Sequence, residues 1–287
     1  MSFNTILIPV DFTVNTRVAI IKGIQLCEGP TPEIHLLNVP QAMTTGIFGY
    51  YRRVVAYFNG GNEQNNSQLH QKLEKCLSDI KKLRNDINAT YWISDSTMVE
   101  KTIAKKAQEI AADLIIIGKN SQHSLLPFLN TVVPSRLAKE TGISVLTVKP
   151  GALSSTVKTV VVPMSSIYPE KKVNIINELK KKYYLNIRLL QLVEKDDDPD
   201  TLRASLVNTC RMLNDRSLDT ISYDILNADR KNWNILNYCR KVDADLLIVN
   251  PGSETKIGWL NKHISDELPV NSKTQVLAVG QGNYSPV

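Results

Sequence analysis

Four short apolar segments occur twice in this sequence, in the same order, and this internal duplication limits the folds that the chain can adopt. In the first copy they read Thr-Ile-Leu-Ile-Pro-Val-Asp, Ile-His-Leu-Leu-Asn-Val, Ala-Asp-Leu-Ile-Ile-Ile and Ile-Ser-Val-Leu-Thr-Val, at residues 5–11, 34–39, 112–117 and 143–148. The second copy has its counterparts at 159–164, 187–192, 244–249 and 274–279. Two copies of about 140 residues are each long enough to bury a core. We therefore expect one domain at 1–150 and a degenerate second domain at 156–287.

The repeated segments are short, nearly continuous runs rich in Val and Ile. Such runs are typical of strands that are buried on both faces of a parallel sheet. Helical patterns lie between them, and one of these begins with Thr97-Met-Val-Glu100, which reads as a capping box. Strands that alternate with helices predict right-handed crossovers. We therefore expect an α/β chain with two tandem, open, parallel five-stranded sheets, each covered by helices on both faces.

The composition indicates where such a chain resides. No apolar run approaches the ~18 residues of a membrane helix. The N-terminus has no basic segment, and its first apolar stretch ends at Asp11, so a signal peptide is not expected. The four cysteines are far apart and form no CxxC, which favours buried thiols in a reducing cytoplasm.

The net charge of +6 raises the question of nucleic-acid binding. Residues 1–150 contain 16 basic and 12 acidic residues, and the remainder contains 18 and 16, so the basic excess is spread along the chain. No basic run is interleaved with aromatic residues. A mildly basic surface is therefore favoured over a nucleic-acid interface.

The two copies differ in length at one place. From Val39 to Asp113 the first copy advances 74 residues, whereas the second advances 53 from Leu192 to Asp245. We assign the 21 extra residues to an insertion at about 41–66, which is rich in tyrosine, arginine and glycine. It can form a lid or a partner surface, or it can extend the next helix and pack on its own domain.

Ligands of open parallel sheets bind at the carboxyl ends of the strands. In the first copy these ends are Pro9-Val10-Asp11-Phe12-Thr13 and Gly118-Lys119-Asn120-Ser121, the second followed by a loop to Thr131. A carboxylate at Asp11 can accept hydrogen bonds from a base or sugar, and a glycine turn before a helix can hold phosphate. Asp11 can equally well cap the helix that follows it.

These residues resemble the universal stress protein family. The resemblance is carried by Ile-Leu-Ile-Pro-Val-Asp-Phe-Thr, Leu-Leu-Asn-Val, Ala-Asp-Leu-Ile-Ile-Ile-Gly and Ser-Val-Leu-Thr-Val-Lys, and it is fainter in the second half. It implies a Rossmann-like fold of the adenine nucleotide alpha hydrolase type, a cytoplasmic protein, self-association as dimers and induction under stress. One branch of the family binds ATP and another does not.

The ATP-binding branch carries a loop G-x2-G-x9-G-[ST] after the fourth strand, whose glycines let backbone amides approach phosphate. Gly118 matches its first position, but Ser121, Thr131 and Val132 occupy the other three. The resemblance also implies that Asp11 and Val39 meet adenine, so the first copy keeps the base end of a site and degrades the phosphate end. The resulting nucleotide-binding candidates are Pro9, Val10, Asp11, Val39, Gly118, Ser121 and Thr131.

The second copy departs further from the ATP-binding pattern. Met164 replaces the aspartate, and the loop positions are taken by Asn250, Ser253, His263 and Ile264. We do not expect this half to bind ATP.

No other catalytic class is indicated. The sequence has no GxGxxG, no P-loop, no H-x-G-H and no histidine spacing suited to a metal. We therefore expect a non-enzymatic stress-response protein that forms an internal pseudo-dimer, can self-associate as a homodimer and acts through unidentified protein partners. No cofactor is required, and ATP or AMP binds weakly at most. The alternative is an adenine-nucleotide sensor or slow ATPase that uses a modified pocket in the first domain.

Overall fold

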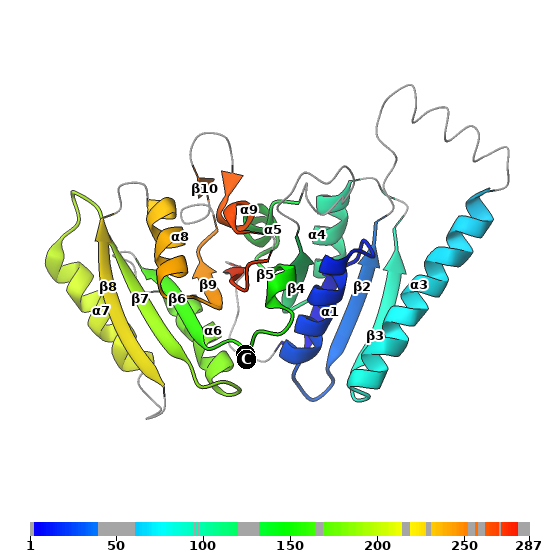
Figure 1. The fold of residues 1–287 in the computed structure, drawn as a ribbon, viewed down its shortest axis with the longest axis horizontal. Coiled ribbons are helices and arrows are strands. Elements are labelled where there is room, and N and C mark those ends of the chain that lie inside the picture. Colours follow the sequence, from blue (N-terminus) through cyan, green and yellow to red (C-terminus); the bar gives the residue numbers. More distant parts are fainter. Residues whose placement is uncertain are drawn as a thin grey trace, which may run out of the picture.

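One ten-stranded sheet crosses the whole molecule in the computed structural model (Figure 1). The structure describes residues 3–39, 61–94, 96, 98–119, 132–164, 169–213, 219–227, 231–251, 256–257, 262–269 and 271–280. The strand order is β3-β2-β1-β4-β5-β12-β9-β6-β7-β8, so each half contributes five adjacent strands.

Within each half the strands are parallel. The first half contains β1 (Thr5–Pro9), β2 (Glu33–Asn38), β3 (Asn88–Ile93), β4 (Leu114–Gly118) and β5 (Ser144–Val148). The second half contains β6 (Thr159–Met164), β7 (Asn186–Val193), β8 (Thr220–Asn227), β9 (Leu246–Val249) and β12 (Gln275–Ala278). A small antiparallel pair, β10 (Lys256–Ile257) and β11 (Lys262–His263), lies outside this sheet.

Helices cover both faces of the sheet, as expected for strands that are apolar on both sides. Neighbouring strand residues point to opposite faces, so Ile6 and Ile8 join one hydrophobic cluster whereas Leu7 joins the other. The first cluster is covered by α1 (Val14–Leu26), α3 (Gly61–Leu83), α6 (Glu170–Lys180) and α7 (Pro199–Leu213). The second is covered by α4 (Val99–Glu109), α5 (Pro134–Thr141), α8 (Lys231–Lys241) and α9 (Ile264–Glu267).

The expected pair of separate sheets is wrong in one respect, because the two halves share a single sheet. β5 and β12 pair antiparallel, with Val145 opposite Ala278 and Thr147 opposite Val276. Each strand would otherwise be the edge of its own half and would leave backbone groups unpaired. This pairing brings the last strands of the two halves together.

The repeated Ala-Asp-Leu segments explain how each half fastens its first strand. Asp113 Oδ2 accepts hydrogen bonds from the backbone N–H groups of Asn4 and Thr5, at 2.9 and 3.0 Å. Asp245 Oδ2 does the same for Lys158 and Thr159, at 3.0 and 2.8 Å. Both aspartates also donate a backbone hydrogen bond to the first strand, to Thr5 O and Thr159 O. The repeat therefore preserves a structural clamp.

The predicted capping box before α4 is wrong. Met98 is the N-cap residue and makes no side-chain cap. Glu100 instead accepts a hydrogen bond of 2.6 Å from Arg136 Nε on α5. The Glu100 carboxylate, which the local pattern assigned to the end of α4, therefore pairs with a side chain of another helix.

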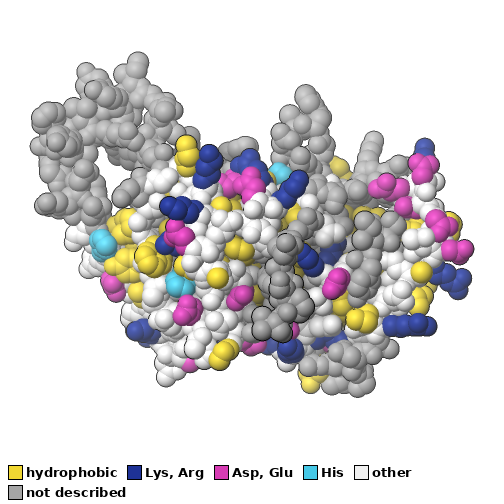
Figure 2. Space-filling view, turned by 180° about the vertical axis from the view of Figure 1, so that it is seen from behind, with side chains coloured by type: hydrophobic (Ala, Val, Ile, Leu, Met, Phe, Trp, Pro, Cys, Tyr) yellow, Lys and Arg dark blue, Asp and Glu magenta, His cyan; other side chains and the backbone are white. Residues whose placement is uncertain are grey.

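The insertion predicted at 41–66 lies largely outside the described residues, and its last part, 61–66, forms the first turns of α3. After β5 a short 3₁₀ turn, Pro150–Ala152, leads toward β6. None of the described helices combines the length and the apolar character that crossing a membrane requires. On the face shown in Figure 2, basic and acidic side chains are interspersed and form no single basic patch.

Candidate functional site

Asp11 stands at the carboxyl end of β1, where the chain turns into α1. Its Oδ1 accepts hydrogen bonds from the Thr13 backbone N–H (3.1 Å), the Thr13 hydroxyl (2.6 Å) and the Thr16 hydroxyl (2.7 Å). Its Oδ2 is buried and has no hydrogen-bond partner in the described structure. Such an oxygen can accept a further hydrogen bond, a state that Asp11 shares with several other buried polar side chains of the described structure. Asp11 thus supports the turn with one oxygen and leaves the other for a donor.

Three other candidates at the same sheet edge lie beneath Asp11. Pro9, Val10 and Val39 are buried, and Val10 and Val39 have no exposed surface. The backbone of Val10 is fully used, since its N–H donates to Leu37 O and its carbonyl accepts from Asn38 Nδ2, both at 2.9 Å. These residues can shape the floor of a site, whereas Asp11 supplies its polar contact.

Gly118 ends β4, and its lack of a side chain is required by packing. A β-carbon at this position would lie 2.2 Å from the carbonyl oxygen of Asn15 in α1. The glycine therefore permits the close approach of a helix to a strand, whatever the loop after it binds. Ser121 and Thr131, the other two candidates of that loop, lie outside the described residues.

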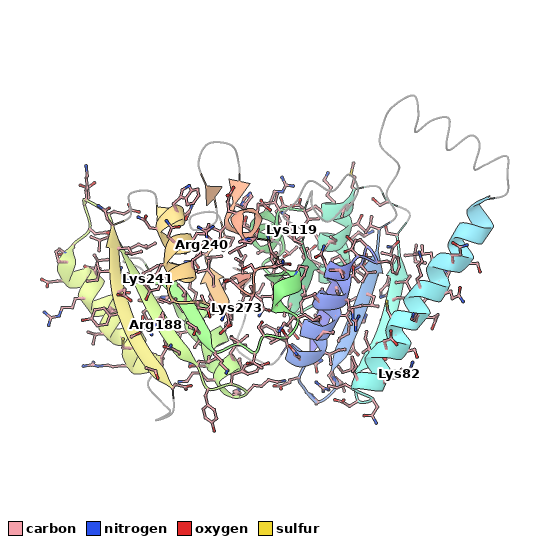
Figure 3. All side chains as sticks on the ribbon, viewed as in Figure 1. Lys82, Lys119, Arg188, Arg240, Lys241 and Lys273 are labelled. Atoms are coloured by element: carbon pink, nitrogen blue, oxygen red, sulfur yellow. The ribbon has the colours of Figure 1, made fainter. Side chains whose placement is uncertain are left out.

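Lys119, the next residue, turns away from solvent toward the second half. Its Nζ donates to Val132 O at 3.1 Å and lies 2.7 Å from Asp266 Oδ1 on α9. Figure 3 shows Lys119 near the centre of the molecule, where the two halves meet. The strand end that begins the candidate loop is thus tied to the other half by an ion pair.

A second buried lysine lies at this junction. Lys149, directly after β5, donates a hydrogen bond from Nζ to Leu268 O. Burial lowers the pKa of Lys149 to about 8, and Asp266 opposes this shift. Two lysines from the first half therefore meet one short segment of the second half.

The described residues at the corresponding place in the second half differ in character, and Ser253 lies outside the described residues. Met164, which takes the place of Asp11, is buried and apolar. His263 is also buried, and its Nδ1 lies 3.3 Å from the Ser135 hydroxyl of the first half. Ile264 has no exposed surface, and Asn250 is only half-buried. This loop is used for contact between the halves.

Sequence reasoning missed the junction of Lys119, Lys149 and Asp266. A signal was present, because both lysines directly follow buried strands, where a charge needs a partner. The partner could not be found from the sequence, because Asp266 is more than 110 residues away from either lysine and lies in no motif that marks it as their partner.

Comparisons with known proteins agree with this architecture. A model of the universal stress protein family matches residues 2–149. Comparison with curated proteins gives no match.

Two solved structures share the fold over almost the whole chain. A universal stress protein from Archaeoglobus fulgidus DSM 4304 is 15% identical, with a TM-score of 0.64 and 98% of each chain covered. The cytoplasmic domain of a prokaryotic cation chloride cotransporter is 8% identical, with a TM-score of 0.55, and covers 99% of this chain and 98% of its own. Identities this low establish the shared fold alone.

Proposed function

Because the chain belongs to the universal stress protein family, we propose that it is a non-enzymatic cytoplasmic stress-response protein whose halves form an internal pseudo-dimer. The first half carries a residual site that binds an adenine nucleotide weakly at most, and the protein acts through other proteins. The domains we propose are 1–150 and 156–287. The four cysteines are free thiols, which is consistent with a reducing compartment.

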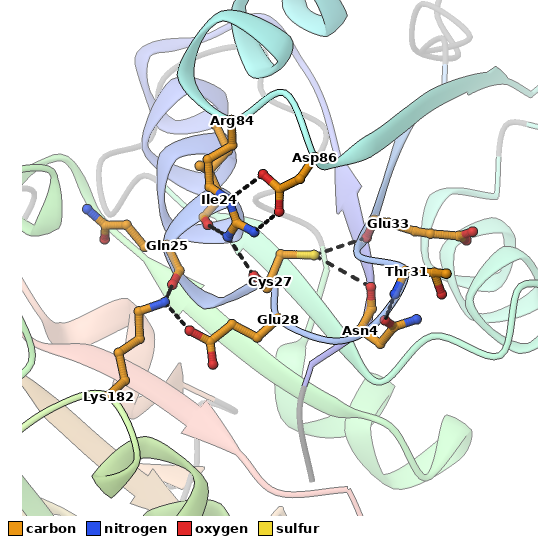
Figure 4. A network of polar contacts seen from close by, with 10 residues as sticks. All are labelled: Asn4, Ile24, Gln25, Cys27, Glu28, Thr31, Glu33, Arg84, Asp86 and Lys182. Atoms are coloured by element: carbon orange, nitrogen blue, oxygen red, sulfur yellow. Dashed lines mark hydrogen bonds and ion pairs between the residues drawn. The ribbon is translucent and has the colours of Figure 1, made fainter.

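The pseudo-dimer is supported by contacts that run along the whole seam between the halves. β5 and β12 join the two sheets. At one end of the seam Lys119 pairs with Asp266. At the other, Lys182 of the second half contacts Gln25 O and the Glu28 carboxylate of the first, as Figure 4 shows. Such a seam takes the place of the subunit contact that a single-domain relative would need a second chain to make.

The contrast between Asp11 and Met164 carries the proposal about nucleotides. Asp11 Oδ2 is buried without a donor in the described structure, so a ribose hydroxyl or a base N–H would satisfy it. Met164 offers no acceptor at the matching place. We therefore place any residual site in the first half.

Weak phosphate binding follows from the residues that replace the loop glycines. Ser121 and Thr131 carry β-carbons that keep backbone amides away from phosphate oxygens. Lys119 is already paired with Asp266, so its charge is not free for a phosphate group. The site should therefore favour adenosine or AMP at least as much as ATP.

The unpartnered oxygen of Asp11 also favours the alternative, an adenine-nucleotide sensor or slow ATPase. Mass spectrometry of small molecules released from the purified full-length protein separates the two functions. We expect less than one tenth of a molecule of adenine nucleotide per chain. Near-stoichiometric ATP or ADP that is lost in Asp11→Ala would instead establish the sensor.

A further inference from the structure

A groove of about 760 Å³ lies between α1 and α3, beside the turn that contains Asp11. Its volume is in the range of small-molecule sites, roughly 300–1,000 Å³. The apolar lining residues come from both helices and from the turn before α1: Phe12, Val14, Ile20, Ile21, Cys76 and Leu83. Val14 and Leu83 are 65% and 63% exposed, although both are large and apolar.

Arg84, which follows α3, joins α3 to α1 beside the Leu83 end of the groove. Its Nη1 donates to Ile24 O at 3.2 Å and to Cys27 O at 2.8 Å, at the C-terminal end of α1 (Figure 4). Its Nε donates to Asp86 Oδ1 at 3.1 Å, which fixes the guanidinium. From this anchor α3 leans away from α1 toward its own N-terminal end (Figure 1). We call this groove the wedge and name its ends by the spacing of the two helices, so that its narrow end is at Leu83 and its wide end at Phe12.

The rim of the wedge is basic, and its charge is concentrated toward the wide end. Lys82, at the narrow end in Figure 3, lies 3.7 Å from Asp79, which offsets it. Arg17, Lys72 and Lys75 have no ion pair within the described structure. Lys72 Nζ lies 5.6 Å from the centre of the Phe12 ring, which places this charge at the wide end.

We propose that this wedge binds a small amphipathic anion, with its apolar body toward Leu83 and its anionic group among Arg17, Lys72 and Lys75. A compact polar anion would leave the apolar walls in water, and an uncharged apolar molecule would make no use of the three cations on the rim. A partner helix, about 10 Å across, would have to pass the Arg84 side chain that joins the two helices beside the Leu83 end. The site differs from the proposed nucleotide site in that it uses neither Asp11 Oδ2 nor the loop after β4, although Thr13 and Thr16, which line the wedge, also donate hydrogen bonds to Asp11 Oδ1.

The probe for this proposal is sodium decanoate, titrated calorimetrically into the full-length protein below its micelle concentration. We expect saturable binding of one decanoate per chain, and at least tenfold weaker binding of decanol and decyltrimethylammonium. Equal binding of decanol would overturn the proposal, because it would remove the role of the basic rim. AMP should not displace decanoate.

Two variants test the two ends of the wedge. Lys72→Glu/Lys75→Glu and Leu83→Asp alter exposed side chains, so both should keep the far-ultraviolet circular dichroism of the parent. Each should weaken decanoate binding at least tenfold. The matched control, Lys101→Glu/Lys105→Glu, makes the same charge change on exposed residues of α4, on the other face of the sheet, and should not alter binding.

Three further results would contradict the proposal. Decanoate that fails to saturate at one per chain shows only non-specific partition. An equal loss in the control variant shows a general charge effect. Binding of an acidic amphipathic peptide, without binding of decanoate, would identify the wedge as a protein-docking surface.

Discussion

Lys119 Nζ of the first half and Asp266 Oδ1 of the second half lie 2.7 Å apart, and this ion pair joins the candidate nucleotide site to the opposite domain. The Lys119 side chain is only 5% exposed, whereas that of Asp266 is 34% exposed. The lysine therefore depends on its partner, because a buried ammonium without a counter-charge is costly.

We expect Asp266→Ala to lower the free energy of unfolding by about 1–3 kcal/mol, since it leaves Lys119 buried without its acid. Urea denaturation of the full-length protein measures this change. The same substitution in a Lys119→Met background should cost clearly less, because the unpaired charge is then absent. Equal costs in both backgrounds would show that the ion pair contributes nothing and that Asp266 acts through its bond to the His263 N–H.

The pH dependence of stability should report the buried amine of Lys149. Its pKa is about 8 in the folded protein, below its ordinary value of 10.5, chiefly because of burial. Between these pH values the unfolded chain binds more protons than the folded one, so stability rises with pH through this window. At pH 7 the full cost of the buried charge is present.

Lys149→Met should therefore be more stable than the parent at pH 7, by roughly 1 kcal/mol or more, since one pKa unit corresponds to about 1.4 kcal/mol. This advantage should shrink between pH 8 and 10. Urea denaturation of both proteins at pH 7 and pH 9.5 tests the sign. A difference that stays constant with pH would show that Lys149 does not titrate in this window.

The clamps of the two repeated aspartates should be equivalent in the two halves. Asp113→Ala and Asp245→Ala each remove an acceptor from two backbone N–H groups, and we expect each to cost about 1–3 kcal/mol. Hydrogen exchange should become faster at the start of β1 in the first variant and of β6 in the second. Asp196→Ala, at an exposed position, serves as the control. If exchange at the clamped amides equals that of the control, the clamps do not stabilise the strands.

Because β5 and β12 pair at the centre of the sheet, we expect a disruption of either strand to destabilise both halves. Val145→Asp and Val276→Asp place a charge in the buried β5–β12 pair and should expose both edges. Light scattering should then show aggregates, whereas Val207→Asp on α7, where the side chain is 41% exposed, should remain unchanged. A first half that is monomeric on its own and as stable as the whole chain would contradict this view.

The strands could be predicted because burial leaves a direct mark on their composition. Ile6, Leu7 and Ile8 are all fully buried, as a continuous apolar run on a two-sided sheet requires. The joining of the two sheets leaves a weaker mark on the sequence. The pairing of β5 with β12 is made by backbone N–H and C=O groups, which almost every residue carries whatever its side chain.

The candidate site was predicted in part. Asp11 could be identified by its place after β1; its Oδ1 holds the turn before α1, whereas Thr13 is the N-cap residue of that helix. The role of Gly118 in packing against Asn15 could not be read from the sequence, because it depends on how closely α1 approaches β4.

Calorimetric titration of adenosine, AMP and ATP into the full-length protein and into Asp11→Ala tests the central claim most directly. The account predicts weak binding, with adenosine or AMP at least as tight as ATP, and no signal in Asp11→Ala, because we propose Asp11 Oδ2 as the acceptor for the base or sugar. Tight binding of ATP that survives Asp11→Ala would contradict it.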